Sequence, residues 1–161
     1  MQKITQLVYR GVRRLFLDPG EAFLITRMAG WVLVLSALVR FQPLPKALQI
    51  VSARNRPSIV DTDEVSRRLV RAIDLLLSLN LLVFKPICWK RAAILHRYLA
   101  LHGLNTQIVF GVRSLTDGKI DGHAWLEFDG EPILETTPPD YQVTYIFPSA
   151  DLDFQISPLP N

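Results

Sequence analysis

The chain contains one cysteine, Cys88, in the stretch PICWKRAAILHRYLALHG. Pro86 fits the first turn of a helix, where its missing N–H costs nothing, so we expect Cys88 in that same turn. Unpaired backbone N–H groups and the positive end of the helix dipole favour a thiolate there. Such a thiolate is a nucleophile, although a free cysteine taken alone is more often a buried, inert side chain.

A thiol nucleophile needs a base, and three histidines are available. His96 and His102 fall on the same predicted helix as Cys88 but beyond side-chain reach of it, so we expect both at the surface. His123 begins the alternating stretch HAWLEFDG, in which His123 and Trp125 point to one face of a strand. His123 is therefore the candidate base.

Two acids remain open as the group that would orient the His123 ring. Asp121 lies two residues before His123 on the same face of the strand, at about 7 Å. Glu127 lies four residues after it, at about 13 Å, which is too far. Glu135 lies on the next predicted strand, so its distance depends on the turn between the two strands.

The turn at Phe128, in the stretch FDGE, decides where Glu135 points. A three-residue loop over FDG, with Gly130 at positive φ, sets Glu135 directly across from His123 with Cβ atoms about 5 Å apart. A two-residue Asp-Gly turn would pair Phe128 with Glu131 and send Glu135 to the opposite face. We predict the three-residue loop, although Asp-Gly favours the two-residue turn on local preference.

The elements that must position these residues change character along the chain. The first half indicates helices over 21–40, from Pro45 to before Pro57, and over the stretch DTDEVSRRLVRAIDLLLSLN. That stretch has Asp61, Thr62 and Asp63 as N-cap candidates. Its predicted apolar stripe consists of Val65, Leu69, Ala72, Ile73 and Leu76.

After the Cys88 helix, which Gly103 ends, come NTQIVFGV, GHAWLEFDG, EPILET and YQVTYIF. These stretches are short, rich in β-branched and aromatic residues, and separated by Gly, Asp and Pro, which is typical of an antiparallel sheet. Cys88, Ala92, Leu95 and Leu99 share one helix face, which should pack on that sheet. Helices first and strands second predict an α+β domain.

The length of 161 residues suits a single domain over 1–161. We divide it into a helical part at 1–80, a catalytic core at 81–147 and an irregular tail at 148–161. One cysteine cannot form an internal disulfide, so we expect a cytoplasmic protein. A single Cys and three scattered histidines make a zinc cluster unlikely on composition, and we expect no cofactor.

The N-terminal region is apolar but does not match a signal peptide, because no small-residue cleavage site closes it. The run MAGWVLVLSALV has only twelve uncharged residues between Arg27 and Arg40, whereas a membrane span needs about 20. We expect a core helix with Trp31, Leu35 and Leu38 largely buried, and a helix lying in a membrane interface is the less favoured alternative. The net charge is +3, and no nucleic-acid motif is present.

The stretch CWKRAAILHRYLALHGLNTQIVFGVR, followed by GHAWLEFDGEPILETTP, resembles the transglutaminase-like cysteine proteases. It is most similar to the leader peptidases of lasso peptide biosynthesis. The shared features are a Cys that opens a helix, HGL at its end, IVFGVR as the next strand, and HAWLE with an acid twelve residues after the His. The resemblance covers about residues 21–137, because the family also has an upstream apolar helix.

This resemblance implies a papain-like core with a Cys–His–Asp triad. Cys88 and His123 carry over directly, and the acid position matches Glu135, where the family usually has Asp. It also implies a bacterial enzyme in its discrete form, which works with a separate leader-recognition protein and a cyclase. The expected function is removal of the leader from a ribosomally made lasso precursor peptide. The alternatives are transglutaminase-like acyl transfer or amide hydrolysis, and a non-catalytic peptide-binding scaffold of the same fold.

Overall fold

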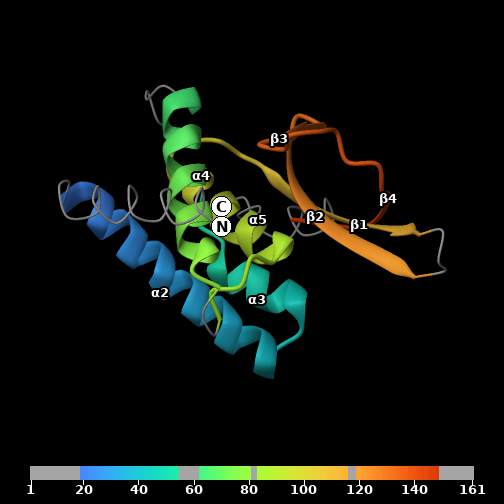
Figure 1. Ribbon diagram of the computed structural model, residues 1–161, viewed down its shortest axis with the longest axis horizontal. Coiled ribbons are helices and arrows are strands. Elements are labelled where there is room, and N and C mark those ends of the chain that lie inside the picture. Colours follow the sequence, from blue (N-terminus) through green and yellow to red (C-terminus); the bar gives the residue numbers. More distant parts are fainter. Residues whose placement is uncertain (1–18, 55–61, 81–82, 116–118, 149–161) are drawn as a thin grey trace, which may run out of the picture.

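The computed structural model describes residues 19–54, 62–80, 83–115 and 119–148 (Figure 1). Its helices are α2 (Pro19–Phe41), α3 (Leu44–Val51), α4 (Thr62–Ser78) and α5 (Cys88–Leu101). Its strands are β1 (Gln107–Ser114), β2 (Ile120–Phe128), β3 (Glu131–Ile133) and β4 (Gln142–Phe147). The α+β class predicted from the sequence is confirmed.

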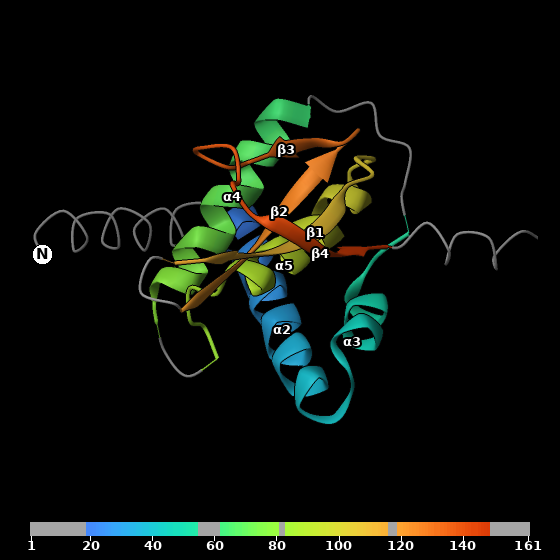
Figure 2. The ribbon, with the colours of Figure 1, turned by 90° about the vertical axis from the view of Figure 1, so that its right-hand side faces the viewer.

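The helices form one layer and the sheet forms the other, with α5 at the contact between them (Figures 1 and 2). The sheet has the order β3-β2-β1-β4, and all its neighbouring strands are antiparallel. The predicted face of α5 is confirmed, since Ala92, Leu95 and Leu99 are all buried. Because α5 begins at Cys88, this packing places the thiol beside the strand that carries His123.

The end of α5 is fixed by backbone hydrogen bonds. Gly103 has φ 87°, and its N–H donates to the carbonyl of Ala100 at 3.1 Å. The N–H of Leu104 donates to the carbonyl of Leu99 at 3.0 Å. This pair of bonds is a Schellman motif, in which glycine takes the left-handed position at no steric cost. It turns the chain from α5 directly into β1.

Helix α4 buries the apolar stripe that its sequence predicts. In α4, Leu69, Ala72, Ile73 and Leu76 are buried, and Val65 packs against the same core. Asp61, one of the three N-cap candidates, lies outside the described residues. The buried face of α4 therefore follows the apolar periodicity of its sequence.

Helix α2 matches the helix predicted over 21–40 to within two residues at each end, and its apolar character extends beyond the twelve-residue run. It has 23 residues. By length and composition alone it could cross a membrane, since an 18-residue stretch of it has a mean hydropathy of 2.0, and 17% of that stretch is buried. Leu35 is fully buried as predicted, whereas Trp31 and Leu38 are half-buried against the core. The opposite side exposes Phe23 and Phe41. Only one face of this helix is thus committed to the core.

The prediction of a surface position is confirmed for His102 and wrong for His96. His96 is only 5% exposed, because α5 is packed between the other helices and the sheet. Its Nδ1 lies 3.0 Å from the hydroxyl of Thr106, and its ring meets the edge of Phe147. Burial lowers the pKa of His96 from 6.5 to about 4, against the smaller opposing effect of a hydrogen bond with the backbone of Thr106.

This buried histidine predicts that the free energy of unfolding falls in mild acid. Since the pKa is about 4 in the folded chain and 6.5 in the unfolded one, the unfolded chain binds more protons between these values. The contribution of His96 to the free energy of unfolding is complete above the unfolded-chain pKa of 6.5, and it is lost as the pH falls toward the folded-chain pKa of about 4. We expect the titration of His96 to lower the free energy of unfolding by about 2 kcal/mol between about pH 7 and about pH 4.5.

Urea unfolding at the two pH values measures this loss. The variant His96→Gln should lose most of the pH dependence, and the matched change His102→Gln at the exposed C-cap of the same helix should keep it. An equal pH dependence in His96→Gln and the wild type would contradict the prediction.

Candidate active site

Cys88 is the first residue of α5 and is half-buried. Ile87 before it is the N-cap residue and is extended, with φ −108° and ψ 123°. Pro86 therefore lies just before the helix and not in its first turn as predicted. The position of Cys88 at the helix N-terminus, where backbone N–H groups have no carbonyl of a preceding turn, is as the sequence predicted.

The segment that leads into Cys88 is anchored from within α5. The Lys90 side chain is buried, and its Nζ donates to the carbonyl of Val83 at 3.0 Å. Burial lowers the pKa of Lys90, and the nearby charge of Lys85 lowers it further. The N–H groups of Lys90 and Arg91 both donate to the carbonyl of Ile87. The turn that presents the thiol is thus held by hydrogen bonds from α5 to the backbone of the segment before Cys88, at Val83 and at Ile87.

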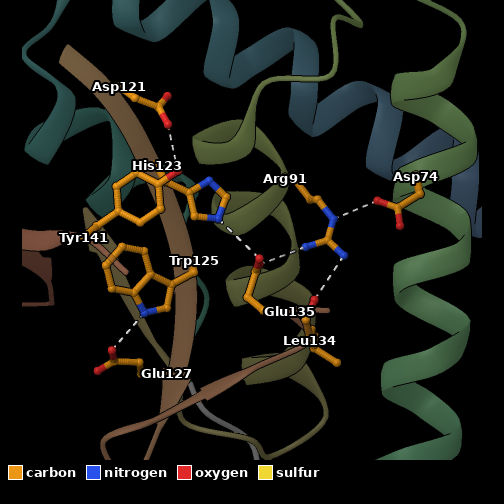
Figure 3. A network of polar contacts seen from close by, with 9 residues as sticks. All are labelled: Asp74, Arg91, Asp121, His123, Trp125, Glu127, Leu134, Glu135 and Tyr141. Carbon is orange, nitrogen blue, oxygen red and sulfur yellow. Dashed lines mark hydrogen bonds and ion pairs between the residues drawn. The ribbon is translucent and has the colours of Figure 1, made fainter. Parts of the chain in front are cut away.

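His123 lies on β2 in contact with two aromatic rings (Figure 3). It stacks on Trp125, with ring centroids 6.0 Å apart and planes inclined by 17°, and lies 5.3 Å from the ring of Tyr141. Trp125 is itself buried, and its indole N–H donates to Glu127 at 2.8 Å. The ring contacts fix the plane of the imidazole. Glu127 is engaged as the hydrogen-bond acceptor of Trp125.

Gly111 makes room for this aromatic cluster. It pairs with His123 across β1 and β2. A Cβ atom on Gly111 would lie 2.7 Å from Cβ of Tyr141 and 3.0 Å from two ring atoms of Trp125. Contacts below 3.0 Å do not occur without displacement of the neighbour, so a side chain here would push Tyr141 away from the imidazole.

Glu135 is brought to His123 and faces it. Oε2 of Glu135 lies 3.2 Å from Nε2 of His123 (Figure 3), and the two side chains are 19% and 27% exposed. An ionised carboxylate only accepts hydrogen bonds, so Nε2 carries the proton in this pair. Nδ1 is then the ring nitrogen available to exchange a proton with a thiol.

The prediction that a three-residue loop creates this contact is wrong. Phe128 pairs with Glu131, so the loop has two residues, Asp129 at φ 52° and Gly130 at φ 81°. This is the turn that Asp-Gly favours locally, with both central residues at positive φ. Only the positive φ of Gly130 was predicted correctly.

Glu135 reaches His123 by another route, because the strand ladder stops before it. β3 ends at Ile133, and Leu134 takes a left-handed φ of 61°, which turns the chain. The left-handed region costs a non-glycine residue about 1–2 kcal/mol. Packing of the Leu134 side chain against the hydrophobic core offsets that cost.

Asp121, the other open acid, is engaged elsewhere. Its Oδ2 accepts hydrogen bonds from Tyr141 at 2.9 Å and from Arg113, its cross-strand partner, at 2.9 and 3.1 Å. The bond from Tyr141 and then those from Arg113 lower the pKa of Asp121, and the same bond raises the pKa of Tyr141. Asp121 therefore holds Tyr141 in place, and the geometry favours Glu135 as the partner of His123.

The three candidate residues line one hollow of about 240 Å³. Its lining residues are Cys88, Arg91, His123, Ala124, Leu134, Glu135 and Thr136. A second hollow of about 350 Å³, walled by the end of α4 and by Pro86 and Ile87, shares Cys88 and Arg91 with the first. Cys88 thus lies where the two hollows meet. Among the described residues, no group of three or more His, Cys, Asp or Glu side chains is placed to hold a metal ion.

Three residues near the site were missed by sequence reasoning. They are Tyr141, Arg91 and Asp74. Arg91 lies three residues after Cys88, one helical turn further along the chain. This spacing alone does not distinguish it from an arginine on an exposed helix face. Its contacts with Asp74 and Glu135 join three segments far apart in the sequence, so no local pattern predicts them.

The sequence matches the family model of the Transglutaminase-like superfamily over residues 31–147, which is more than half of the chain. The chain belongs to this superfamily. Comparison with curated proteins and with solved structures gave no match. The matched range runs from α2 to the end of β4, so it includes all three candidate residues of this transglutaminase-like site. Members of the superfamily are typically cysteine peptidases or acyltransferases.

The two acids give a direct test of the assignment. Glu135→Gln should lower the reactivity of Cys88 toward iodoacetamide about tenfold or more, because a neutral amide stabilises the imidazolium less well. Asp121→Asn, the matched change on the acid that holds Tyr141, should lower it less. The rate of alkylation near neutral pH measures both, and circular dichroism should show both variants folded. A larger loss in Asp121→Asn would reassign the orienting role.

Gly111 supplies a second prediction for the transglutaminase-like site. Gly111→Ala should displace Tyr141, slow the alkylation of Cys88, and lower the free energy of unfolding by about 1–3 kcal/mol through overpacking. The matched control is Gly122→Ala, since a Cβ there meets only the carbonyl oxygen of Gly111 at 3.9 Å. If both variants behave alike, the close packing at Gly111 does not support the site.

Proposed function

We propose that this protein is a cysteine peptidase in which Cys88 is the nucleophile, His123 the acid–base group and Glu135 the residue that orients His123. One observation carries the proposal. The only cysteine of the chain stands at a helix N-terminus and shares a hollow with an imidazole that is held at 3.2 Å by a carboxylate. Each group is of the type that thiol-based amide hydrolysis requires.

In the first half of the reaction, the Cys88 thiolate attacks the carbonyl carbon of the scissile amide and forms a carbon–sulfur bond. The backbone N–H of Cys88, at the positive end of α5, donates to the oxyanion that develops. The His123 imidazolium then gives its proton to the amide nitrogen, the carbon–nitrogen bond breaks, and an amine leaves. Glu135 stabilises the imidazolium before this transfer.

In the second half, water attacks the thioester while His123 accepts a proton from it. The carbon–sulfur bond breaks, a carboxylic acid leaves, and the thiolate and imidazolium return. An amine in place of water at this step would give acyl transfer, which the superfamily match fits equally well. Analysis of the reaction products must therefore decide whether water or an amine is the acceptor.

For the substrate, we propose the leader of a ribosomally made precursor of the lasso type. The support is the resemblance in the stretches around Cys88 and His123, and the coarser superfamily match agrees with it. On this proposal the protein acts in the cytoplasm together with a separate leader-recognition protein and a cyclase. A short precursor, a small recognition protein and an asparagine-synthetase-like cyclase encoded beside this chain would support it.

The test uses the purified full chain, a leader-bearing precursor peptide and water labelled with heavy oxygen, with and without the recognition protein. Hydrolysis should leave heavy oxygen in the new carboxyl group of the leader fragment, whereas transfer to an added amine should leave none. Cys88→Ala and His123→Ala should each lower the rate of cleavage by at least about a thousandfold, while the protein stays folded.

His102→Ala is the matched control, because His102 is an exposed histidine at the C-cap of α5, away from the hollow. It should cleave at the wild-type rate. Full activity in Cys88→Ala would refute the nucleophile assignment, and a folded wild-type protein that neither cleaves nor transfers would favour the scaffold alternative.

A further inference from the structure

Arg91 stands in the middle of a chain of charged contacts that runs from α4 to His123 (Figure 3). Its Nε donates to Oδ1 of Asp74 at 2.8 Å, and its Nη1 lies 3.6 Å from Oε1 of Glu135. Its Nη2 also donates to the carbonyl of Leu134 at 3.5 Å. The guanidinium therefore contacts both the carboxylate of Glu135 and the backbone just before it. Glu135 keeps its other oxygen, Oε2, for His123.

Glu135 needs such support because no strand holds it. The β2–β3 ladder ends at the pair Leu126–Ile133, and Leu134 then turns the chain at φ 61°. A glutamate also has one more rotatable bond than an aspartate, so it has more side-chain conformations to restrict. The planar guanidinium has N–H donors in a fixed fork, which suits it to hold a carboxylate in one orientation.

We propose that Arg91, itself held by Asp74, is a positioning residue that keeps Glu135 turned toward His123. This inference rests on the proposed function, because it gives Glu135 its place in the triad. Arg91 lies one helical turn after Cys88, so the same turn of α5 that presents the thiol also holds the acid. Asp74 fixes the guanidinium by its Nε edge and leaves the two terminal nitrogens for the segment at Leu134 and Glu135.

Two other roles for Arg91 make different predictions. If it only ties α4 to α5 through Asp74, its loss should lower stability without a specific effect on Cys88. If it only binds substrate, since it lines both hollows, its loss should not affect a reaction that needs no peptide. If it positions Glu135, its effect should disappear once Glu135 is removed.

A double-mutant cycle in the full chain separates these roles. The variants are Arg91→Met, Glu135→Ala and the two combined, and the reaction is alkylation of Cys88 by iodoacetamide near neutral pH. We expect Arg91→Met alone to slow alkylation about tenfold, and to change it less than about twofold in the Glu135→Ala background. Arg91→Lys, which keeps the charge but not the fork, should recover part of the rate.

The nitrogen chemical shift of His123 Nε2 supplies a readout that involves no reaction. Arg91→Met should shift it toward the value in Glu135→Ala, because the hydrogen bond from Nε2 is lost in both. The matched control is Arg68→Met, which removes an Nε–carboxylate pair of 2.7 Å between α4 and α2. It should keep the wild-type alkylation rate and the wild-type His123 signal.

If Arg91→Met does not fold, Asp74→Asn carries the same cycle, with a smaller loss of rate that again depends on Glu135. A wild-type rate in the folded Arg91 or Asp74 variants, or losses that multiply with that of Glu135→Ala, would overturn the inference. A wild-type Cys88 that reacts no faster than in the urea-unfolded chain would overturn the proposed function together with it.

Discussion

The burial of α5 against the sheet is the contact on which the rest of the structure depends. Its residues Ile94, Leu95 and Leu99 are fully buried, and the helix contacts α2, α3 and α4 as well as β1 and β2. Since Cys88 is the first residue of this helix and His123 lies on β2, the thiol and the imidazole share a hollow only while this contact is intact. The hydrophobic core thus sets the geometry between the two candidate catalytic groups.

The parts of the site that the sequence predicts are those with local causes. A proline before the cysteine and a glycine after the apolar run locate both ends of α5 to within two residues. The alternation in HAWLEF puts His123 on a strand, and the Asp-Gly pair fixes a turn at the end of it. Each of these signals lies within a few residues of the feature that it predicts.

The parts that the sequence does not predict depend on contacts between distant segments. Glu135 was expected beside His123 and lies there, but through a different turn from the one predicted, because the left-handed Leu134 breaks the ladder and leucine gives no sign of that conformation. His96 was expected at the surface because it lies beyond side-chain reach of Cys88, whereas α5 is covered on nearly every side. Arg91 was missed because its partners come from α4 and from the segment after β3.

The three candidate residues are held in three different ways, and the acid, where the sequence resemblance implies Asp, is the one held least by regular secondary structure. Cys88 is fixed by a helix and His123 by strand pairing, so neither can move without disturbing the core. Glu135 lies beyond the ladder and is held by side-chain contacts alone, so its reach is set by its own length and by Arg91. A side chain longer than aspartate by one methylene can be accommodated at such a position, because the loop and the guanidinium absorb the difference and the core does not.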